Sequence, residues 1–255
     1  ATLGVRHDNT DDFDSETTYR VTANYHLTDS SRLRAAHGTG FRAPSLFELH
    51  GFTPSNFGSA YFGNPELDAE TSENWELGLD QNWLNDRLTS SVTVFKNDID
   101  DLITTVFLPG FNSTSVNQNK ADIHGVEAAL SLAATSQVDV NLNYTFTRTE
   151  DDNDQELLRR PKHQASLDIE YRPITRLILT ATLHHVGSRK DVDGIGQRIN
   201  MGGYSVVNLA ANYQLSNSTR LFGRIENLAD KNYEPAYGFQ ATGMLSIVGI
   251  EIANY

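Results

Sequence analysis

Apolar and polar residues alternate one by one along much of this chain, most regularly between Gln137 and Arg172. Successive side chains of a β-strand point to opposite faces, so an alternating run predicts a strand with one apolar and one polar face. Two such runs lie here on either side of an acidic stretch, which predicts a large hairpin. Their apolar members are Val138, Val140, Leu142, Tyr144 and Phe146 in the first run and Ala165, Leu167, Ile169 and Tyr171 in the second.

The same alternation recurs from end to end and predicts an all-β chain of about twelve strands, with residues 1–255 forming one domain. Helical signals are scarce, because no segment sustains the spacing of three and four residues that a helix requires. Besides the central hairpin, the expected strands are residues 3–7, 17–28, 32–37, 75–84, 87–97, 124–134, 176–186, 204–215, 219–227 and 244–252.

The connections between these strands alternate between short and long. The short ones, at residues 28–31, 85–86, 135–136, 172–175 and 216–218, carry the Asn, Asp, Ser and Pro of tight turns. The long ones are residues 8–16, 38–74, 98–123, 148–162, 187–203 and 228–243. This strict alternation is typical of antiparallel transmembrane β-barrels, which have short turns at one rim and long loops at the other.

Alternation alone leaves open which face is inside. A soluble, lipocalin-like barrel would enclose Leu142, Leu167 and Ile169, whereas a membrane barrel turns them to lipid and its polar face to the lumen. Aromatic residues expected near strand ends on the apolar face favour the membrane barrel, since such rings gather at lipid–water interfaces. They are Tyr19, Tyr25, Trp75, Trp83, Tyr144, Tyr171, Tyr204 and Tyr213. The polar face is expected to carry Arg20, Arg34, Glu76, Asp80, Glu127, Asp139, Asp168, Glu170, Arg172, Arg224 and Glu226.

Composition narrows the function classes further. The net charge of −13 and the pI near 4.9 argue against nucleic acid as a partner. The absence of cysteine excludes disulfides within the chain. No window of about 18 apolar residues predicts a transmembrane helix, and a transmembrane barrel leaves no such window either. The chain opens directly on a strand-like run without a signal peptide, so we expect it to be either mature or a fragment.

Four stretches go beyond the alternation, namely residues 40–49, residues 63–72 with the following Trp75-Glu76, Gly125-Val126-Glu127, and residues 227–233. In this order and spacing they resemble the C-terminal half of TonB-dependent outer-membrane receptors. The resemblance implies a barrel of about 22 strands with a plugged lumen in the outer membrane of a Gram-negative bacterium. It also implies that the N-terminal plug and the TonB box, through which such receptors contact TonB, lie outside this chain.

Residues 157–164, 200–203 and 237–243 further resemble the vitamin B12 (cobalamin) receptors of that family. This resemblance implies uptake of cobalamin, with a siderophore or another TonB-dependent ligand as the alternative. A guanidinium of Arg159 or Arg160 would donate to the amides or phosphate of cobalamin, or would instead pair with the acidic run after Glu150. The residues expected to contact the ligand are Arg159, Arg160, Asp191, Arg198, Tyr237, Phe239 and Gln240.

Other chemistry finds little support in the sequence. The acidic residues of 8–16 and 150–156 offer oxygen ligands suited to calcium, but they lack the spacing of an EF-hand, and we expect no other cofactor. Neighbouring His184 and His185 point to opposite faces of a strand and cannot chelate one ion together. No nucleophile elbow, phosphate loop or zinc motif is present, so we expect no enzyme, although a lipase or protease on a membrane barrel is a second class to test.

The two ends of the expected sheet pose a separate question. A strand without a neighbour exposes backbone N–H and C=O groups that lipid cannot satisfy. We therefore expect one of two outcomes. Either residues 3–7 pair with residues 244–252 and close a smaller barrel of about twelve strands, or the isolated chain keeps two unpaired edges and aggregates. An open sheet would mark the chain as a piece of a larger receptor.

Overall fold

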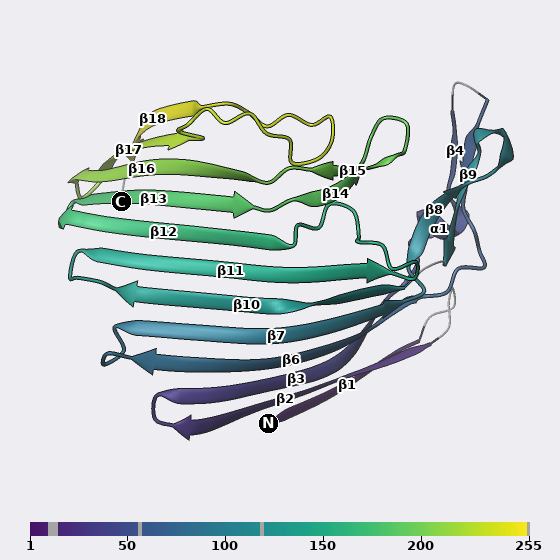
Figure 1. Ribbon diagram of the computed structural model, residues 1–255, viewed down its shortest axis with the longest axis horizontal. Coiled ribbons are helices and arrows are strands. Elements are labelled where there is room, and N and C mark those ends of the chain that lie inside the picture. The colour runs from purple at the N-terminus through teal and green to yellow at the C-terminus, as the bar shows by residue number, and fades with distance from the viewer. Residues whose placement is uncertain (10–14, 56–57, 118–119, 254–255) are drawn as a thin grey trace.

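The computed structural model describes residues 1–9, 15–55, 58–117 and 120–253 (Figure 1). Within them, twelve strands form one antiparallel sheet, in which each strand pairs with the next along the chain among these twelve. All the strands that the alternation predicts are confirmed. They are β1 (Thr2–Asp8), β2 (Glu16–Thr28), β3 (Ser31–Arg42), β6 (Glu70–Trp83), β7 (Leu88–Asp100), β10 (Ala121–Ala133), β11 (Val138–Asp151), β12 (His163–Ile174), β13 (Leu177–Val186), β16 (Tyr204–Ser216), β17 (Thr219–Glu226) and β18 (Leu245–Ile252).

Several strands run further than the alternation predicts. The largest difference is in β3, which continues to Arg42 rather than ending at His37, because its last residues pair with the start of β6, from Gly38 opposite Asn74 to Arg42 opposite Glu70. Gly38 and Gly40 have no side chain that could show an apolar or polar face. The alternation is therefore invisible in a segment whose backbone is nevertheless fully paired.

Short elements that the sequence does not predict fill the long connections, which gather at the right-hand end of Figure 1, opposite the short turns. Three to five residues are too few for a period of two to stand out. Strands β4, β5, β9 and β8 form a small separate sheet, and β14 pairs with β15 as a hairpin. The elements are α1 (Leu46–His50), β4 (Phe52–Pro54), β5 (Ala60–Phe62), β8 (Ile103–Phe107), the 3₁₀ turn Pro109–Phe111, β9 (Ser113–Asn117), β14 (Arg189–Val192) and β15 (Arg198–Met201).

Helix α1 begins at a capping box. The backbone N–H of Glu48 donates to Ser45 Oγ at 3.2 Å, and the N–H of Ser45 donates to Glu48 Oε2 at 2.7 Å. Two N–H groups at the start of the helix, which have no partner within it, are thereby satisfied. The guanidinium of Arg42 pairs with Glu48 at 3.2 Å and with Glu70 at 2.6 Å, which joins the first two sequence motifs. With five residues, α1 is far from spanning a membrane, and no other helix of the described chain has the length and apolar character to do so.

The two faces of the large sheet have opposite character, as predicted. Leu142, Leu167 and Leu183 are successive cross-strand partners on one face, and Asn141, Asp168 and Thr182 are successive partners on the other. The apolar face is open, since Leu142 is 41% exposed and Ile169 is 37% exposed. A lipocalin-like barrel would enclose these side chains, so the open face disfavours that alternative.

The charged residues predicted for the polar face do lie there, and many pair across strands. Asp80 accepts from Arg32 at 2.6 Å and from Arg34 at 2.9 Å, and Arg172 pairs with Asp139 at 2.5 Å. Alternation along each strand and register between strands place both members of a pair on one face. The polar face therefore balances much of its own charge near the short turns.

Tyr204 is a correction to the aromatic residues predicted for the apolar face. Its cross-strand partner is Val186, a polar-face position, while the following Ser205 pairs with His185 on the apolar face. The ring of Tyr204 stacks on that of Tyr233, with centroids 4.1 Å apart. The local sequence misleads because Val206 and Val207 are both apolar, so the alternation has no clear phase at the start of β16.

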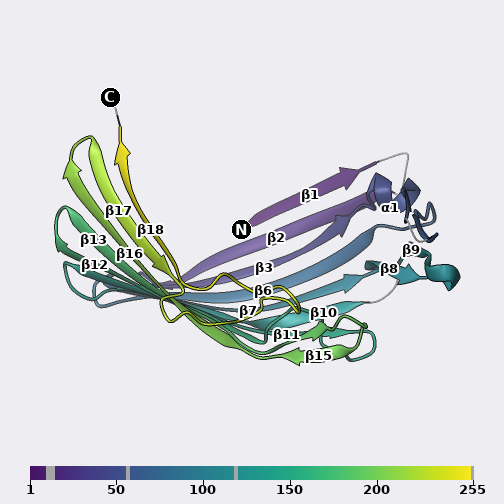
Figure 2. The same cartoon turned by 90° about the horizontal axis from the view of Figure 1, so that it is seen from above.

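Closure of the sheet into a twelve-stranded barrel is the alternative that the structure overturns. Strand β1 pairs with β2 and β18 pairs with β17, and among the described residues no pairing joins β1 to β18. Figures 1 and 2 show one bent and twisted sheet with β1 and β18 at its two edges. The open form is therefore the one observed.

Gly125, in the third sequence motif, lies so close to neighbouring residues that a larger side chain there should lower stability. A Cβ atom there would lie 2.0 Å from the carbonyl oxygen of Phe146 and 2.8 Å from the ring of Phe95. Because a backbone oxygen cannot move aside cheaply, we expect Gly125→Ala to lower the free energy of unfolding by about 1–3 kcal/mol. The measurement is urea unfolding in detergent, followed by tryptophan fluorescence.

The matched control is Gly4→Ala, which also replaces a strand glycine but meets nothing within 4 Å. It should leave the unfolding midpoint nearly unchanged. Equal midpoints for the two variants would contradict the steric explanation.

Candidate functional site

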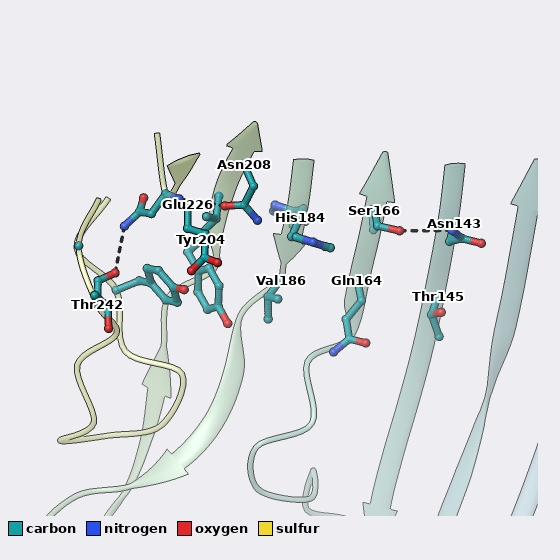
Figure 3. Close-up of a pocket in the computed structure, with 16 residues that line it drawn as sticks. Asn143, Thr145, Gln164, Ser166, His184, Val186, Tyr204, Asn208, Glu226 and Thr242 are labelled. Carbon is teal, nitrogen blue, oxygen red and sulfur yellow. Dashed lines mark hydrogen bonds between the residues drawn. The ribbon is translucent and has the colours of Figure 1, made fainter. Parts of the chain in front are cut away.

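A hollow of about 680 Å³ lies on the polar face at the end of the sheet that bears the long connections. Strands β11, β12, β13, β16 and β17 form its wall, and the connection between β17 and β18 covers one side (Figure 3). Alternation along these strands brings together side chains from distant parts of the sequence. Among the lining residues are Asn143, Thr145, Gln164, Ser166, His184, Tyr204, Asn208, Glu226 and Thr242.

The hollow is lined mainly by neutral groups that donate and accept hydrogen bonds. Amides, hydroxyls, two imidazoles and two phenols dominate, and only a few hydrogen bonds are made within the wall, such as that from Asn143 Nδ2 to Ser166 Oγ at 3.3 Å. The carboxylate in the set, Glu226, pairs with Arg224 at 3.2 Å. Such a wall suits a polar ligand rich in oxygen or nitrogen atoms.

Asn227, which opens the fourth sequence motif, builds the turn beside the hollow. It is 4% exposed and adopts a left-handed backbone conformation, with φ of 51°. Its Nδ2 donates to the carbonyl of Lys231 at 2.9 Å and its Oδ1 accepts from the N–H of Lys231 at 2.8 Å. This motif therefore holds the chain in a tight turn that starts the last long connection.

Asp191, predicted as a ligand contact, has no exposed surface. Its Oδ1 accepts from Arg159 Nε at 3.0 Å and from the N–H of Val192 at 2.8 Å, while its Oδ2 accepts from the N–H of Tyr237 at 2.8 Å. The carboxylate is fully engaged within the protein. In this conformation it links Arg159 to Tyr237 and has no surface that a ligand can contact.

The other predicted contacts lie in the same group of outer connections and remain exposed. The side chain of Arg159 is 52% exposed despite its bond to Asp191, and Arg160 is exposed beside it. Tyr237 is 43% exposed and Phe239 is 70% exposed. Arg198 donates to the carbonyl of Glu156, and Gln240 donates to Asn232 Oδ1 at 3.3 Å. The structure thus brings together connections 148–162, 187–203 and 228–243, and a ligand contact at these residues stays a prediction.

Of the two acidic stretches proposed to bind calcium, the structure describes only the second in full. Residues 10–14, in the middle of the first, lie outside the described residues. In the second, Asp151 Oδ1 accepts from the N–H groups of Asn153 and Gln155, each at 2.9 Å, and closes a turn. Across the described parts of the chain, no group of three or more His, Cys, Asp or Glu side chains is arranged to hold a metal ion.

The two neighbouring histidines lie on opposite faces, as predicted, with His184 opposite Val206 and His185 opposite Ser205. His185 Nδ1 and Ser205 Oγ are 2.9 Å apart, a contact that the sequence did not suggest. No acidic side chain of the described chain is bonded to this imidazole, so the third group of a hydrolase triad is not provided there.

Sequence reasoning missed Arg189, a buried arginine near the hollow that bonds to several backbone carbonyls. It is 4% exposed, and its guanidinium donates to the carbonyls of Pro235 at 3.0 Å, of Gly202 at 3.3 Å and of Glu234. The guanidinium carbon also lies 5.5 Å from the centre of the Tyr204 ring. No local signal marks this arginine, because its acceptors are backbone atoms up to 46 residues away.

Comparison with known proteins shows a family to which the sequence of this chain matches. A family model described as "TonB dependent receptor-like, beta-barrel" matches residues 1–228. The match therefore covers the sheet from β1 to the end of β17 and most of the residues that line the hollow.

Solved structures share the fold at low sequence identity. The siderophore receptor PirA from Acinetobacter baumannii matches with a TM-score of 0.83 and 19% identity, over 98% of this chain and 43% of that one. The ferric enterobactin receptor PfeA from Pseudomonas aeruginosa, a mutant in complex with enterobactin, matches with a TM-score of 0.82 and 20% identity, over 98% and 42%. PirA from P. aeruginosa gives 0.79 and 23%, over 98% and 44%. The chain thus spans less than half the length of each of them.

The surroundings of Asp191 predict how its contacts respond to acid. Burial alone would raise the pKa of this carboxyl, but the amides of Tyr237 and Val192 and the guanidinium of Arg159 outweigh it and hold the pKa below the ordinary 3.8. A carboxyl whose pKa is lowered by folding stabilises the folded form fully at pH values above its ordinary pKa. This stabilisation is lost as the pH falls toward the pKa of the folded state. We expect the Tyr237 amide to stay protected from hydrogen exchange from about pH 7 to about pH 4 and to lose protection only below that range.

Mass spectrometry of peptides that contain Tyr237, with rates corrected for the intrinsic pH dependence of exchange, measures this effect. Asp191→Asn, which cannot ionise, should abolish the acid step. Loss of protection already between about pH 5 and pH 6 would contradict a lowered pKa.

Proposed function

Since this chain belongs to the family of TonB-dependent receptor-like β-barrels, we propose that it forms barrel wall and outer loops of an outer-membrane uptake receptor for a siderophore-type ferric complex. The receptors named above are proteins of this fold, and none of them is an enzyme by its description. The proposed location is the outer membrane of a Gram-negative bacterium. Lipid would contact the apolar face, and a plug outside this chain would contact TonB.

The main support for this proposal is the hollow on the polar face of the sheet. It lies at the end of the sheet that bears the long connections, with connection 228–243 along one side, and it offers amide, hydroxyl, imidazole and phenol groups with few bonds among themselves. Most of a bound ligand's polar atoms could therefore find partners without breaking existing contacts.

Exposed cations in the outer connections support an oxygen-rich, anionic ligand. The guanidiniums of Arg159, Arg160 and Arg198 all lie in these outer connections, and planar guanidinium groups bind oxygen anions through paired hydrogen bonds. A ferric ion in such a complex is held by oxygen donors, which present their remaining lone pairs outward. The chemistry fits although the chain as a whole carries a net charge of −13.

Cobalamin is the second candidate ligand. Residues 157–164 and 237–243 resemble the cobalamin receptors in sequence, and an arginine would suit the phosphate of that ligand equally well. The three receptors named above are described as siderophore or ferric enterobactin receptors, and this favours the siderophore.

Membrane placement predicts different environments for neighbouring residues of β12. Because the chain has no cysteine, Leu167→Cys and Asp168→Cys each add a single labelling site within it. We expect a lipid-soluble quencher to reach a fluorophore at 167, and a water-soluble quencher to reach one at 168. The reverse result would overturn the proposed orientation.

A charge on the apolar face tests the same placement by stability. Leu142→Arg should cost about 2–4 kcal/mol of unfolding free energy in lipid if the residue lies near the midplane. Asn141→Arg is the matched control, since it adds the same side chain to the polar face of the same strand and should cost much less.

Ligand recognition is tested with ferric enterobactin and cobalamin as probes, using the full-length protein that contains this chain. We expect ferric enterobactin to bind more tightly than cobalamin. Arg160→Ala should weaken its binding about tenfold through loss of one charge-assisted hydrogen bond. Arg159→Ala should weaken it further, because it also leaves the buried Asp191 without its cationic partner. Intrinsic fluorescence quenching on ligand titration measures both effects.

Arg87→Ala is the control for these arginines, since Arg87 lies at a short turn and donates to the carbonyl of Ala134 at 2.7 Å. It should leave ligand affinity unchanged. Tight binding of cobalamin without binding of ferric enterobactin would replace the siderophore proposal, and binding of neither probe would overturn the uptake function.

A further inference from the structure

The β14–β15 hairpin lies between two other outer connections and is bonded to both. On one side, the N–H of Arg159 donates to the carbonyl of Lys190 at 2.7 Å, and Arg159 Nε donates to Asp191. A third bond on this side runs from Arg198 to the carbonyl of Glu156. Connection 148–162 is therefore held to the hairpin by both backbone and side-chain bonds.

On its other side the hairpin binds connection 228–243 through two residues of β14. Asp191 Oδ2 accepts from the N–H of Tyr237, and Arg189 donates to the carbonyls of Glu234 and Pro235. Alternation along the strand puts Arg189 and Asp191 on one face, and both are buried, at 4% and 0% exposure. One short strand thus carries a buried donor and a buried acceptor that reach into neighbouring segments.

Buried charges of this kind favour one arrangement of the loops over others. Taking a guanidinium or a carboxylate out of water is costly unless each charged atom finds a partner. Here every bond across to connection 228–243 ends on a backbone atom, so the contacts fix the path of the chain itself. If the loops separated, both charges would lose these partners together.

We propose that Arg189 and Asp191 are positioning residues, which join the three outer connections into one platform and so hold the exposed Tyr237, Phe239 and Gln240 ready for the ligand. This inference rests on the proposed function, since it concerns the same ligand. A loop that is already ordered loses less conformational entropy when it binds. The platform therefore raises affinity for an oxygen-rich ferric complex without contacting it through Asp191.

The first experiment needs no ligand. In the full-length protein, hydrogen exchange at the amides of Tyr237 and Val192, which donate to Asp191, should become about tenfold faster in Asp191→Ala. Asp191→Asn keeps one acceptor oxygen and should give an intermediate rate, which keeps the test valid if the alanine variant folds poorly. Unchanged exchange in both variants would overturn the proposal.

Asp193→Ala is the matched control on the same hairpin. Asp193 Oδ1 accepts from the N–H groups of Ile195 at 3.0 Å and Gln197 at 2.8 Å, both within the hairpin's own turn. Its loss should leave exchange at Tyr237 and ligand affinity unchanged. If Asp193→Ala loosened Tyr237 as much as Asp191→Asn did, the specific role of Asp191 would be lost.

The second experiment links the platform to the ligand. Affinity for ferric enterobactin should fall about tenfold in Asp191→Asn, mainly through faster dissociation, with no change in the unfolding midpoint of the barrel. Nitroxide labels at Ile195→Cys and Phe239→Cys, both exposed positions, should show a broader distance distribution in this variant. Faster exchange with unchanged affinity would overturn the positioning role and leave the proposed function standing. Binding of neither ferric enterobactin nor cobalamin by the wild type would overturn the function, and with it the role of the platform in binding.

Discussion

Register between neighbouring strands is the constraint on which the rest of this structure depends. Side chains alternate with a period of two, so a slip of one residue between any two strands would move a whole strand's apolar side chains to the polar face. The irregularities in pairing, between His26 and Thr28, Tyr171 and Ile174, and Gln214 and Ser216, all lie at the short turns. Along the remaining length the two faces stay distinct from β1 to β18.

This arrangement leaves little apolar core of the usual kind. The buried hydrophobic residues of the described chain are Leu49, Leu67, Ala69, Ala121 and Val206, while many large apolar side chains are exposed on one face of the sheet. Backbone pairing, together with burial of that face in lipid in the proposed membrane placement, therefore supplies the stability that a core supplies elsewhere. At the outer end, buried polar residues such as Arg189, Asp191 and Asn227 do the work of holding the connections together.

The motifs that indicate the family serve local structure more than ligand recognition. Arg42 joins Glu48 to Glu70, Gly125 admits the backbone of Phe146, and Asn227 closes a turn. Each satisfies a steric or hydrogen-bonding requirement of the sheet or of its connections. Such motifs therefore identify the fold well and discriminate poorly between cobalamin and a siderophore.

The sequence by itself determined the strands, the two faces and the rim that carries the long connections, because these follow from alternation and turn residues within short windows. It identified the long outer connections, and it expected Asp191 to contact the ligand and Tyr204 to lie on the apolar face, whereas the structure buries Asp191 and places Tyr204 on the polar face. Only the tertiary structure decided these two, and only it revealed Arg189. The reason is physical: burial and hydrogen-bond partners come from segments up to 46 residues away, whose approach no local pattern records.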